Sequence, residues 1–269
     1  MDQQSPASAS NYYDAKVQSF FDIWGGEHIH FGIYLDETET LAEASARTVE
    51  KMYSLLSREQ QGARILDLGS AFGGPARLLS SKGHHVTCVD LSAANNQVNR
   101  QLNAANGFDS IMILEENFES LSLPDDSFDI VWSQDAICHA SNLEKVFREA
   151  YRVLKPGGAF ALCNTCCGDA IPEDVLEALN KRNSLSLQTI GRHSELATSV
   201  GFIESVCLDM SEHPRVHYKK MLQGVHVKEA EMVERGGREY FDRVVRSLEY
   251  WLGVCDAGHM TWGMWKFMK

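Results

Sequence analysis

The stretch Arg64-Ile-Leu-Asp-Leu-Gly-Ser-Ala-Phe-Gly-Gly-Pro-Ala-Arg77 carries the strongest structural signal in the chain. Its apolar run contains Asp67 and passes into a glycine-containing turn, after which a helix is expected. Glycines allow the backbone to approach a ligand closely, and the N-terminus of the following helix offers unpaired N–H groups. A second apolar run, Val86-Thr-Cys-Val-Asp90, ends in another acid 17 residues after Gly73. An acid at this position can accept both hydroxyls of a ribose.

Outward from this stretch, short apolar runs alternate with segments of helical spacing. Alternating strands and helices indicate an α/β fold, in which helices cover both faces of a mostly parallel sheet. The expected strands are Ala63–Leu68, His85–Leu91, Ser110–Glu115, Phe128–Ser133, Ala159–Asn164, Phe202–Leu208 and Met260–Phe267.

Two classes of ligand fit the glycine loop: a dinucleotide and S-adenosylmethionine. Ala71 stands where a dinucleotide loop has its second glycine, which normally lets the backbone meet a pyrophosphate. The Asp67 carboxylate would repel phosphates but suits a ligand that carries an ammonium and a sulfonium. These residues favour S-adenosylmethionine over a dinucleotide, and a purely structural turn before a helix is the remaining alternative.

The chain resembles the class I S-adenosylmethionine-dependent methyltransferases over roughly residues 60–170. The motifs occur in order: Leu66–Gly74, Val89–Ser92, Asn117-Phe118, Phe128–Asp135 and Val153–Gly158. The resemblance implies a seven-stranded Rossmann-like sheet with a reversed final strand. Asn117 stands where the family usually has an acid near the adenine, and its amide can still hydrogen-bond the base. The implied cofactor-binding residues are Asp67, Gly69, Ala71, Gly73, Asp90, Leu91, Asn117, Phe118 and Ser133.

The flanking segments resemble the sarcosine/dimethylglycine N-methyltransferases, which make glycine betaine. The matching pieces are Asn11–Asp14, Ile23–His30, Trp132–Ala136 with His139, Val216–Tyr218, Leu248–Trp251 and Thr261–Met264. The resemblance implies in-line methyl transfer to a small-molecule amine. The alternatives are a methyltransferase for a phospho-amine, a thioether acid or a natural-product scaffold, a cofactor-binding module without catalysis, and a nicotinamide oxidoreductase.

Candidate catalytic and substrate-binding residues follow from this chemistry. Asp135 and His139 come at the end of the fourth expected strand, where a carboxylate or an imidazole could orient or deprotonate the amine; His139 could instead shape the pocket through hydrogen bonds. A glycine-type substrate also carries a carboxylate, for which an arginine offers two-point recognition. The candidates for substrate contacts, each with ordinary packing or surface roles as the alternative, are Trp24, Tyr34, Arg192, His217 and Tyr218.

The domain organisation predicted from the sequence is one methyltransferase domain over residues 11–269 after a disordered tail at 1–10. Helical spacing over Asn11–Trp24 and Thr40–Leu56 indicates an N-terminal helical lid at 11–60, before a cofactor-binding core at 61–170. Pro214–Val254 indicates a helical insertion between the last two strands, and residues 211–256 are expected to form a cap over the ligand crevice.

Composition excludes several classes of function. Of the 269 residues 44% are hydrophobic, as in folded proteins, and the net charge of −12 disfavours nucleic acid as a partner. No apolar run reaches membrane-spanning length, and the polar first residues do not resemble a signal peptide. Seven scattered cysteines indicate free thiols in a reducing compartment, so we expect a cytoplasmic enzyme. Neither Cys163-Asn-Thr-Cys-Cys167 nor the pair His28 and His30 has further ligands nearby, so no metal is expected.

Overall fold

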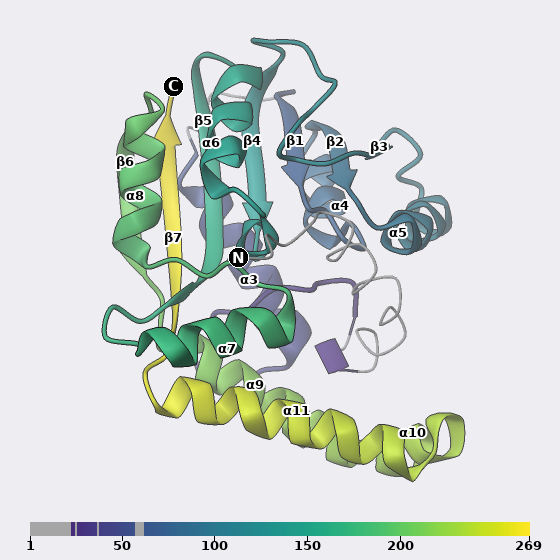
Figure 1. Ribbon diagram of the computed structural model, residues 1–269. Coiled ribbons are helices and arrows are strands. Elements are labelled where there is room, and N and C mark those ends of the chain that lie inside the picture. Colours follow the sequence, from purple (N-terminus) through teal and green to yellow (C-terminus); the bar gives the residue numbers. More distant parts are fainter. Residues whose placement is uncertain (1–22, 25, 37, 57–61) are drawn as a thin grey trace.

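The computed structural model describes residues 23–24, 26–36, 38–56 and 62–269. In this part of the chain seven strands form one sheet in the order β3-β2-β1-β4-β5-β7-β6 (Figure 1). The strands are β1 (Arg64–Leu68), β2 (His85–Asp90), β3 (Met112–Glu115), β4 (Phe128–Gln134), β5 (Leu154–Cys167), β6 (Ile203–Asp209) and β7 (Met260–Met268). All seven expected strands are therefore present.

Strand directions match the expected fold class. β1 pairs in parallel with β2 and β4, and the parallel pairing continues to β3 and to β5. β7 lies between β5 and β6 and is antiparallel to both. The α/β fold with a mostly parallel sheet and a reversed final strand is confirmed. Because parallel strands end at the same edge, the loops after β1, β2, β3 and β4 meet there.

Helices cover both faces of the sheet. Successive side chains along each strand point to opposite faces and therefore pack in two separate cores. Ile65 and Trp132 pack in one core with Val49 of α3. Leu66 and Val131 pack in the other with α6 and α8. The described helices are α3 (Leu41–Ser54), α4 (Gly74–Ser81), α5 (Ala93–Asn106), the short η1 (Ile137–His139), α6 (Leu143–Val153), α7 (Glu173–Asn183), α8 (Ile190–Ser199), α9 (His213–Val227), α10 (Glu229–Gly236) and α11 (Arg238–Asp256).

The insertion between β6 and β7 consists of three helices, α9, α10 and α11, with Gly237 at φ +81° between the last two. Figure 1 shows these helices and α7 on the side where the parallel strands end. We refer to α7, α9, α10 and α11 together as the cap. That α7, which follows β5, lies with the inserted helices was not predicted from the sequence.

A second covering element comes from the N-terminal side. The expected helix over 40–56 is present as α3, which Thr40 and Glu43 begin with reciprocal side-chain-to-backbone hydrogen bonds. The expected tail at 1–10 and nearly all of the helix expected over 11–24 lie outside the described residues. Residues 27–34, which we call the strap, precede α3 and contact both α4, which follows β1, and Asp135, which follows β4.

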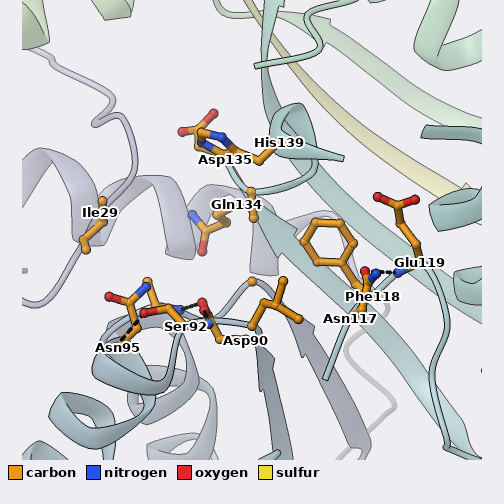
Figure 2. A pocket seen from close by; sticks show the side chains of 14 residues that line it. Ile29, Asp90, Ser92, Asn95, Asn117, Phe118, Glu119, Gln134, Asp135 and His139 are labelled. Carbon is orange, nitrogen blue, oxygen red and sulfur yellow. Dashed lines mark hydrogen bonds between the residues drawn. The ribbon is translucent and has the colours of Figure 1, made fainter. Parts of the chain in front are cut away.

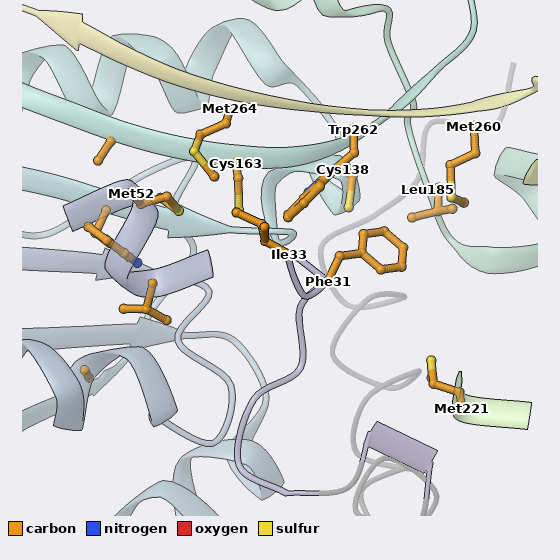
Figure 3. Packing of buried hydrophobic residues seen from close by; sticks show 14 of the residues in the cluster. Phe31, Ile33, Met52, Cys138, Cys163, Leu185, Met221, Met260, Trp262 and Met264 are labelled. Atoms are coloured by element: carbon orange, nitrogen blue, oxygen red, sulfur yellow. The ribbon is translucent and has the colours of Figure 1, made fainter. Parts of the chain in front are cut away.

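The strap is held by contacts along its length. Glu27 forms an ion pair with the buried Arg77 of α4 at 2.6 Å, and the Ile33 N–H donates to the Ala44 carbonyl. Figure 3 shows Phe31 and Ile33 of the strap packed with residues from β5, β7 and the cap, among them Cys163, Trp262 and Met221. The strap is therefore held against α3, α4 and the core of the sheet by contacts along its length.

Candidate functional site

The loop after β1 has the backbone shape that its glycines predict. Gly69 and Gly73 have φ values of +72° and +77°, and Ala71 lies at +45°. The Gly69 N–H donates to the Val89 carbonyl at 2.7 Å, and the Ala71 N–H donates to a carboxylate oxygen of Asp90 at 2.8 Å. A Cβ on Gly69 would lie 2.2 Å from that of Ala136. The loop is thus fastened to the end of β2 in a conformation that glycine favours.

A first cavity of about 650 Å³ opens beside this loop. Figure 2 shows Asp90, Ser92 and Asn95 on one side of it and Asp135 with His139 on the other, with Ile29 of the strap and Phe118 facing each other across it. The full lining comprises Ile29, Gly69, Ala71, Asp90, Leu91, Ser92, Asn95, Asn117, Phe118, Glu119, Gln134, Asp135, Ala136 and His139.

Asp90 is fixed by two backbone donors. One carboxylate oxygen accepts the Ala71 N–H and the other accepts the Ser92 N–H, both at 2.8 Å. Ser92 also caps α5 by accepting from the Asn95 N–H. On the third strand end, the Asn117 side-chain oxygen accepts the Glu119 N–H at 2.9 Å, while Phe118 presents its ring to the cavity.

Three predicted cofactor residues, Asp67, Gly73 and Ser133, do not line this cavity. Asp67 is buried and one of its carboxylate oxygens has no hydrogen-bond partner. Burial, reinforced by Asp90, raises the pKa of Asp67 to about 8. Gly73 begins α4 and lies against Asn99. The Ser133 hydroxyl donates to the Leu68 carbonyl and so joins β4 to β1, whereas the next residue, Gln134, lines the cavity.

The loop after β4 places Asp135 and His139 together. Asp135 has φ +48°, and its carboxylate accepts the Phe31 N–H, the Thr165 hydroxyl and the Trp262 indole N–H, each at 3.0 Å. Burial nevertheless raises the pKa of Asp135 to about 6. The strap, β5 and β7 therefore all orient this one carboxylate.

His139 lies in η1, with its Nδ1 at 2.7 Å from the Ser184 carbonyl. Because a carbonyl only accepts, Nδ1 carries the proton and Nε2 is the acceptor nitrogen. Burial lowers the pKa of His139 to about 4, so the ring is neutral near pH 7.

A second, larger cavity of about 1410 Å³ lies under the cap. It shares Ile29, Asp135 and His139 with the first, so the two cavities meet at these residues. Its other lining residues are Ile23, Trp24, Phe31, Cys138, Thr165, Asn183, Leu185, Tyr218, Met221, Tyr240, Arg243, Val244, Ser247, Leu248, Trp251 and Met260.

The predicted substrate residues divide into three groups. Trp24 and Tyr218 line the second cavity. Tyr34 and His217 lie behind its wall: the Tyr34 hydroxyl is 2.9 Å from His217 Nδ1, and the His217 ring packs 5.1 Å from Trp24. Arg192 lies in neither lining; it is in α8, exposed, and forms an ion pair with Glu195.

Several lining residues were not predicted from the sequence. Arg243, Ser247 and Trp251 repeat every four residues along α11, which is the spacing of one helix face. A cation and a hydroxyl on an otherwise apolar helix face were the available signal. No comparable signal marks Asn183 and Leu185, because they reach the cavity through the position of α7.

The described residues contain no group of three His, Cys, Asp or Glu side chains arranged to hold a metal. The paired histidines are hydrogen-bonded to each other, with His28 Nδ1 at 3.0 Å from His30 Nε2. In the same part of the chain, no helix is long and apolar enough to span a membrane.

Comparison of the sequence and the fold with known proteins identifies the protein family. Residues 66–162 match the model of a methyltransferase domain. A sarcosine/dimethylglycine N-methyltransferase of Aphanothece halophytica is 37% identical over 97% of this chain and 96% of its own, and one of Halorhodospira halochloris is 34% identical over 100% and 98%. The structure of a proposed sarcosine dimethylglycine methyltransferase from Galdieria sulphuraria superposes with a TM-score of 0.88 at 31% identity, covering 95% of this chain and 98% of that one.

The fold is that of an S-adenosylmethionine-dependent methyltransferase. The chain belongs to the methyltransferase family that includes these sarcosine/dimethylglycine N-methyltransferases.

The residues around the first cavity fit S-adenosylmethionine. The Asp90 carboxylate lines the cavity at the position expected for ribose hydroxyls, and Phe118 and Leu91 offer apolar surface for an adenine. Asp67, two residues before Gly69, has a buried carboxylate oxygen without a hydrogen-bond partner but lies outside the lining of this cavity.

Proposed function

We propose that the chain methylates sarcosine to dimethylglycine, dimethylglycine to glycine betaine, or both. The observation that carries this proposal is the junction of the two cavities at Asp135 and His139. A methyl donor in the first cavity and an amine in the second would meet there. The names of the full-length relatives supply the substrate class.

S-adenosylmethionine supplies an electrophilic methyl group, and the protein binds and orients the amine that attacks it. Sarcosine and dimethylglycine are ammonium ions near pH 7, so each must lose a proton to expose its lone pair. The Asp135 carboxylate would attract the ammonium and is placed to receive its proton. His139, as a neutral acceptor at Nε2, would orient the remaining N–H of sarcosine.

The walls of the second cavity suit a methylated ammonium. Trp24, Tyr218 and Trp251 all line it, and Tyr218 and Trp251 are stacked with centroids 5.8 Å apart. Aromatic faces attract quaternary ammonium groups through their negative quadrupole. The strap and the cap would keep water from the donor during transfer. We also propose a small-molecule amine as the partner. The seven free cysteines support a cytoplasmic location, which we propose as well.

The proposal is tested with the purified full chain and S-adenosylmethionine against sarcosine, dimethylglycine, glycine and phosphoethanolamine. Proton NMR of the products identifies each N-methyl group directly. We expect turnover of sarcosine, dimethylglycine or both, with N-methylated glycines as the products. Turnover of phosphoethanolamine alone, or of none of the four, would show that this substrate assignment is wrong.

A further inference from the structure

The second cavity contains opposite charges on different elements. Among its described lining residues, Asp135 at the junction is the only carboxylate and Arg243 of α11 is the only arginine or lysine. The one histidine in the lining, His139, is neutral near pH 7 because burial lowers its pKa. A ligand in this cavity therefore meets one anionic and one cationic group.

Arg243 is positioned by its helix. Val244 and Leu248 are buried and fix the rotation of α11 against the core. That rotation turns Arg243 and Ser247, one helical turn apart, toward the cavity. The Arg243 guanidinium lies 5.6 Å from the centre of the Tyr240 ring, which also lines the cavity.

Arg243 also differs from most other arginines in its partners. Arg77, Arg192 and Arg215 each form an ion pair with a carboxylate. On α11 itself, Arg238 pairs with both Glu229 and Asp242. Within the described residues no carboxylate lies in ion-pair distance of Arg243, so its planar donor fork can bind a ligand carboxylate.

We propose that Arg243 recognises the carboxylate of the substrate and makes the enzyme select amino acids over amines that lack this group. Binding at Arg243 would hold one end of the zwitterion while its nitrogen faces Asp135. Ser247 would add a hydroxyl donor beside the guanidinium. This inference rests on the proposed function and assigns to α11 the role that the sequence assigned to Arg192.

The experiment compares dimethylglycine with 2-(dimethylamino)ethanol, which has the same tertiary amine and no carboxylate. Binding of each to the full chain loaded with S-adenosylhomocysteine is measured by calorimetry, and KM and kcat are measured for dimethylglycine. The variants are Arg243→Ala and Arg243→Lys, with Arg192→Ala as the matched control that removes an arginine outside the cavity.

We expect Arg243→Ala to weaken dimethylglycine binding and raise its KM about 10- to 100-fold, since a charge-assisted pair is lost. Arg243→Lys should lie between, because lysine keeps the charge without the fork. Arg192→Ala should bind dimethylglycine as the wild type does, with the same KM. Every variant should bind 2-(dimethylamino)ethanol with unchanged affinity.

Unchanged dimethylglycine binding in Arg243→Ala, or an equal loss for both ligands, would overturn the assignment. Failure of the proposed function is seen separately, since the wild-type protein would then neither bind nor methylate dimethylglycine.

Discussion

At the scale of single residues, the site depends on a carboxylate that is both buried and well supplied with donors. Asp135 accepts three hydrogen bonds, which favour its ionised form, yet burial outweighs them and raises its pKa to about 6. His139 nearby stays neutral for the same reason, because burial disfavours its charged form. Of the two, only Asp135 is expected to change charge between pH 5 and 7.

We therefore expect kcat/KM for dimethylglycine to rise with pH through about 6, as Asp135 loses its proton. Asp135→Asn should remove this inflection and lower kcat by about 100-fold or more. His139→Gln should keep the inflection, since His139 titrates near pH 4. A pH–rate profile of the three proteins checks this, and an inflection near 6 that persists in Asp135→Asn would contradict it. Calorimetric titration with S-adenosylhomocysteine confirms that each variant is folded.

Asp67 gives a second prediction at this scale, concerning stability. Burial raises its folded pKa to about 8 from the ordinary value of 3.8, so the folded chain holds a proton that the unfolded chain releases. The free energy of unfolding should therefore fall between pH 4 and 8, by at most roughly 1.4 kcal/mol per pH unit, and level off above pH 8.

Asp67→Asn should remove that part of the pH dependence, whereas Asp109→Asn, at an exposed position, should leave it in place. Urea unfolding of the ligand-free proteins at pH 6, 7 and 8 measures the difference. Parallel curves for wild type and Asp67→Asn would show that Asp67 is not protonated in the folded chain.

At the scale of elements, the glycine loop joins β1 to α4 and forms one side of the first cavity. Its shape depends on close approach as much as on backbone freedom, since Gly69 lies against Ala136 of the β4 loop. The strap acts on the same loop from above: a Cβ on Gly74 would lie 2.8 Å from His28 Nδ1. The loop, the strap and the β4 loop are therefore packed as one unit.

Gly69→Ala tests this packing. The new Cβ would lie 2.2 Å from the Cβ of Ala136, and the backbone φ of +72° is unfavourable for alanine. Gly83→Ala is the matched control, with a φ of +90° and open space around its Cβ. We expect the control to lose about 1 kcal/mol of stability and to bind S-adenosylhomocysteine normally. Gly69→Ala should lose more stability and bind this ligand at least 10-fold more weakly, by roughly 1.4 kcal/mol. Thermal melts and calorimetry provide both values; equal effects of the two substitutions would contradict the packing account.

Strands and helices could be predicted where the pattern of apolar residues within one short segment indicates them. Apolar runs located β1 and β2, and helical spacing over 40–56 located α3. The fold class followed from the alternation of these elements. The face of the sheet that a given helix covers depends on tertiary packing, which single-sequence periodicity does not encode.

Arg192 and Arg243 show this limit for the site. Arg192 is in α8, whose Leu196 packs with α6 in the core opposite the strap, while Arg243 is in α11 beside the second cavity. The only local signal for Arg243 is its place with Ser247 on an otherwise apolar helix face, and that signal does not show which cavity the face lines. Ser133 is a similar case, since its hydroxyl is used between β4 and β1 and the neighbouring Gln134 lines the cavity instead.

At the scale of the whole molecule, two covers close over one sheet edge: the strap from the N-terminal side and the cap from between β6 and β7. The first cavity lies between the strap and the strand ends, and the second cavity lies under the cap. Residues of α7, α9 and α11 line the second cavity only, whereas residues of the loops after β1 and β2 line the first only. Of the carboxylates behind the net charge of −12, Asp90 lines the first cavity and Asp135 lies at the junction of the two cavities.

We expect the acceptor amine to bind in the second cavity with its nitrogen at the junction. The most direct measurement is a crystal structure of the full chain with S-adenosylhomocysteine and dimethylglycine. Dimethylglycine should lie under the cap, with its nitrogen beside Asp135 and His139 and its carboxylate toward Arg243. Dimethylglycine bound outside the cap, or with its nitrogen turned away from Asp135, would show that the amine is not methylated at this junction.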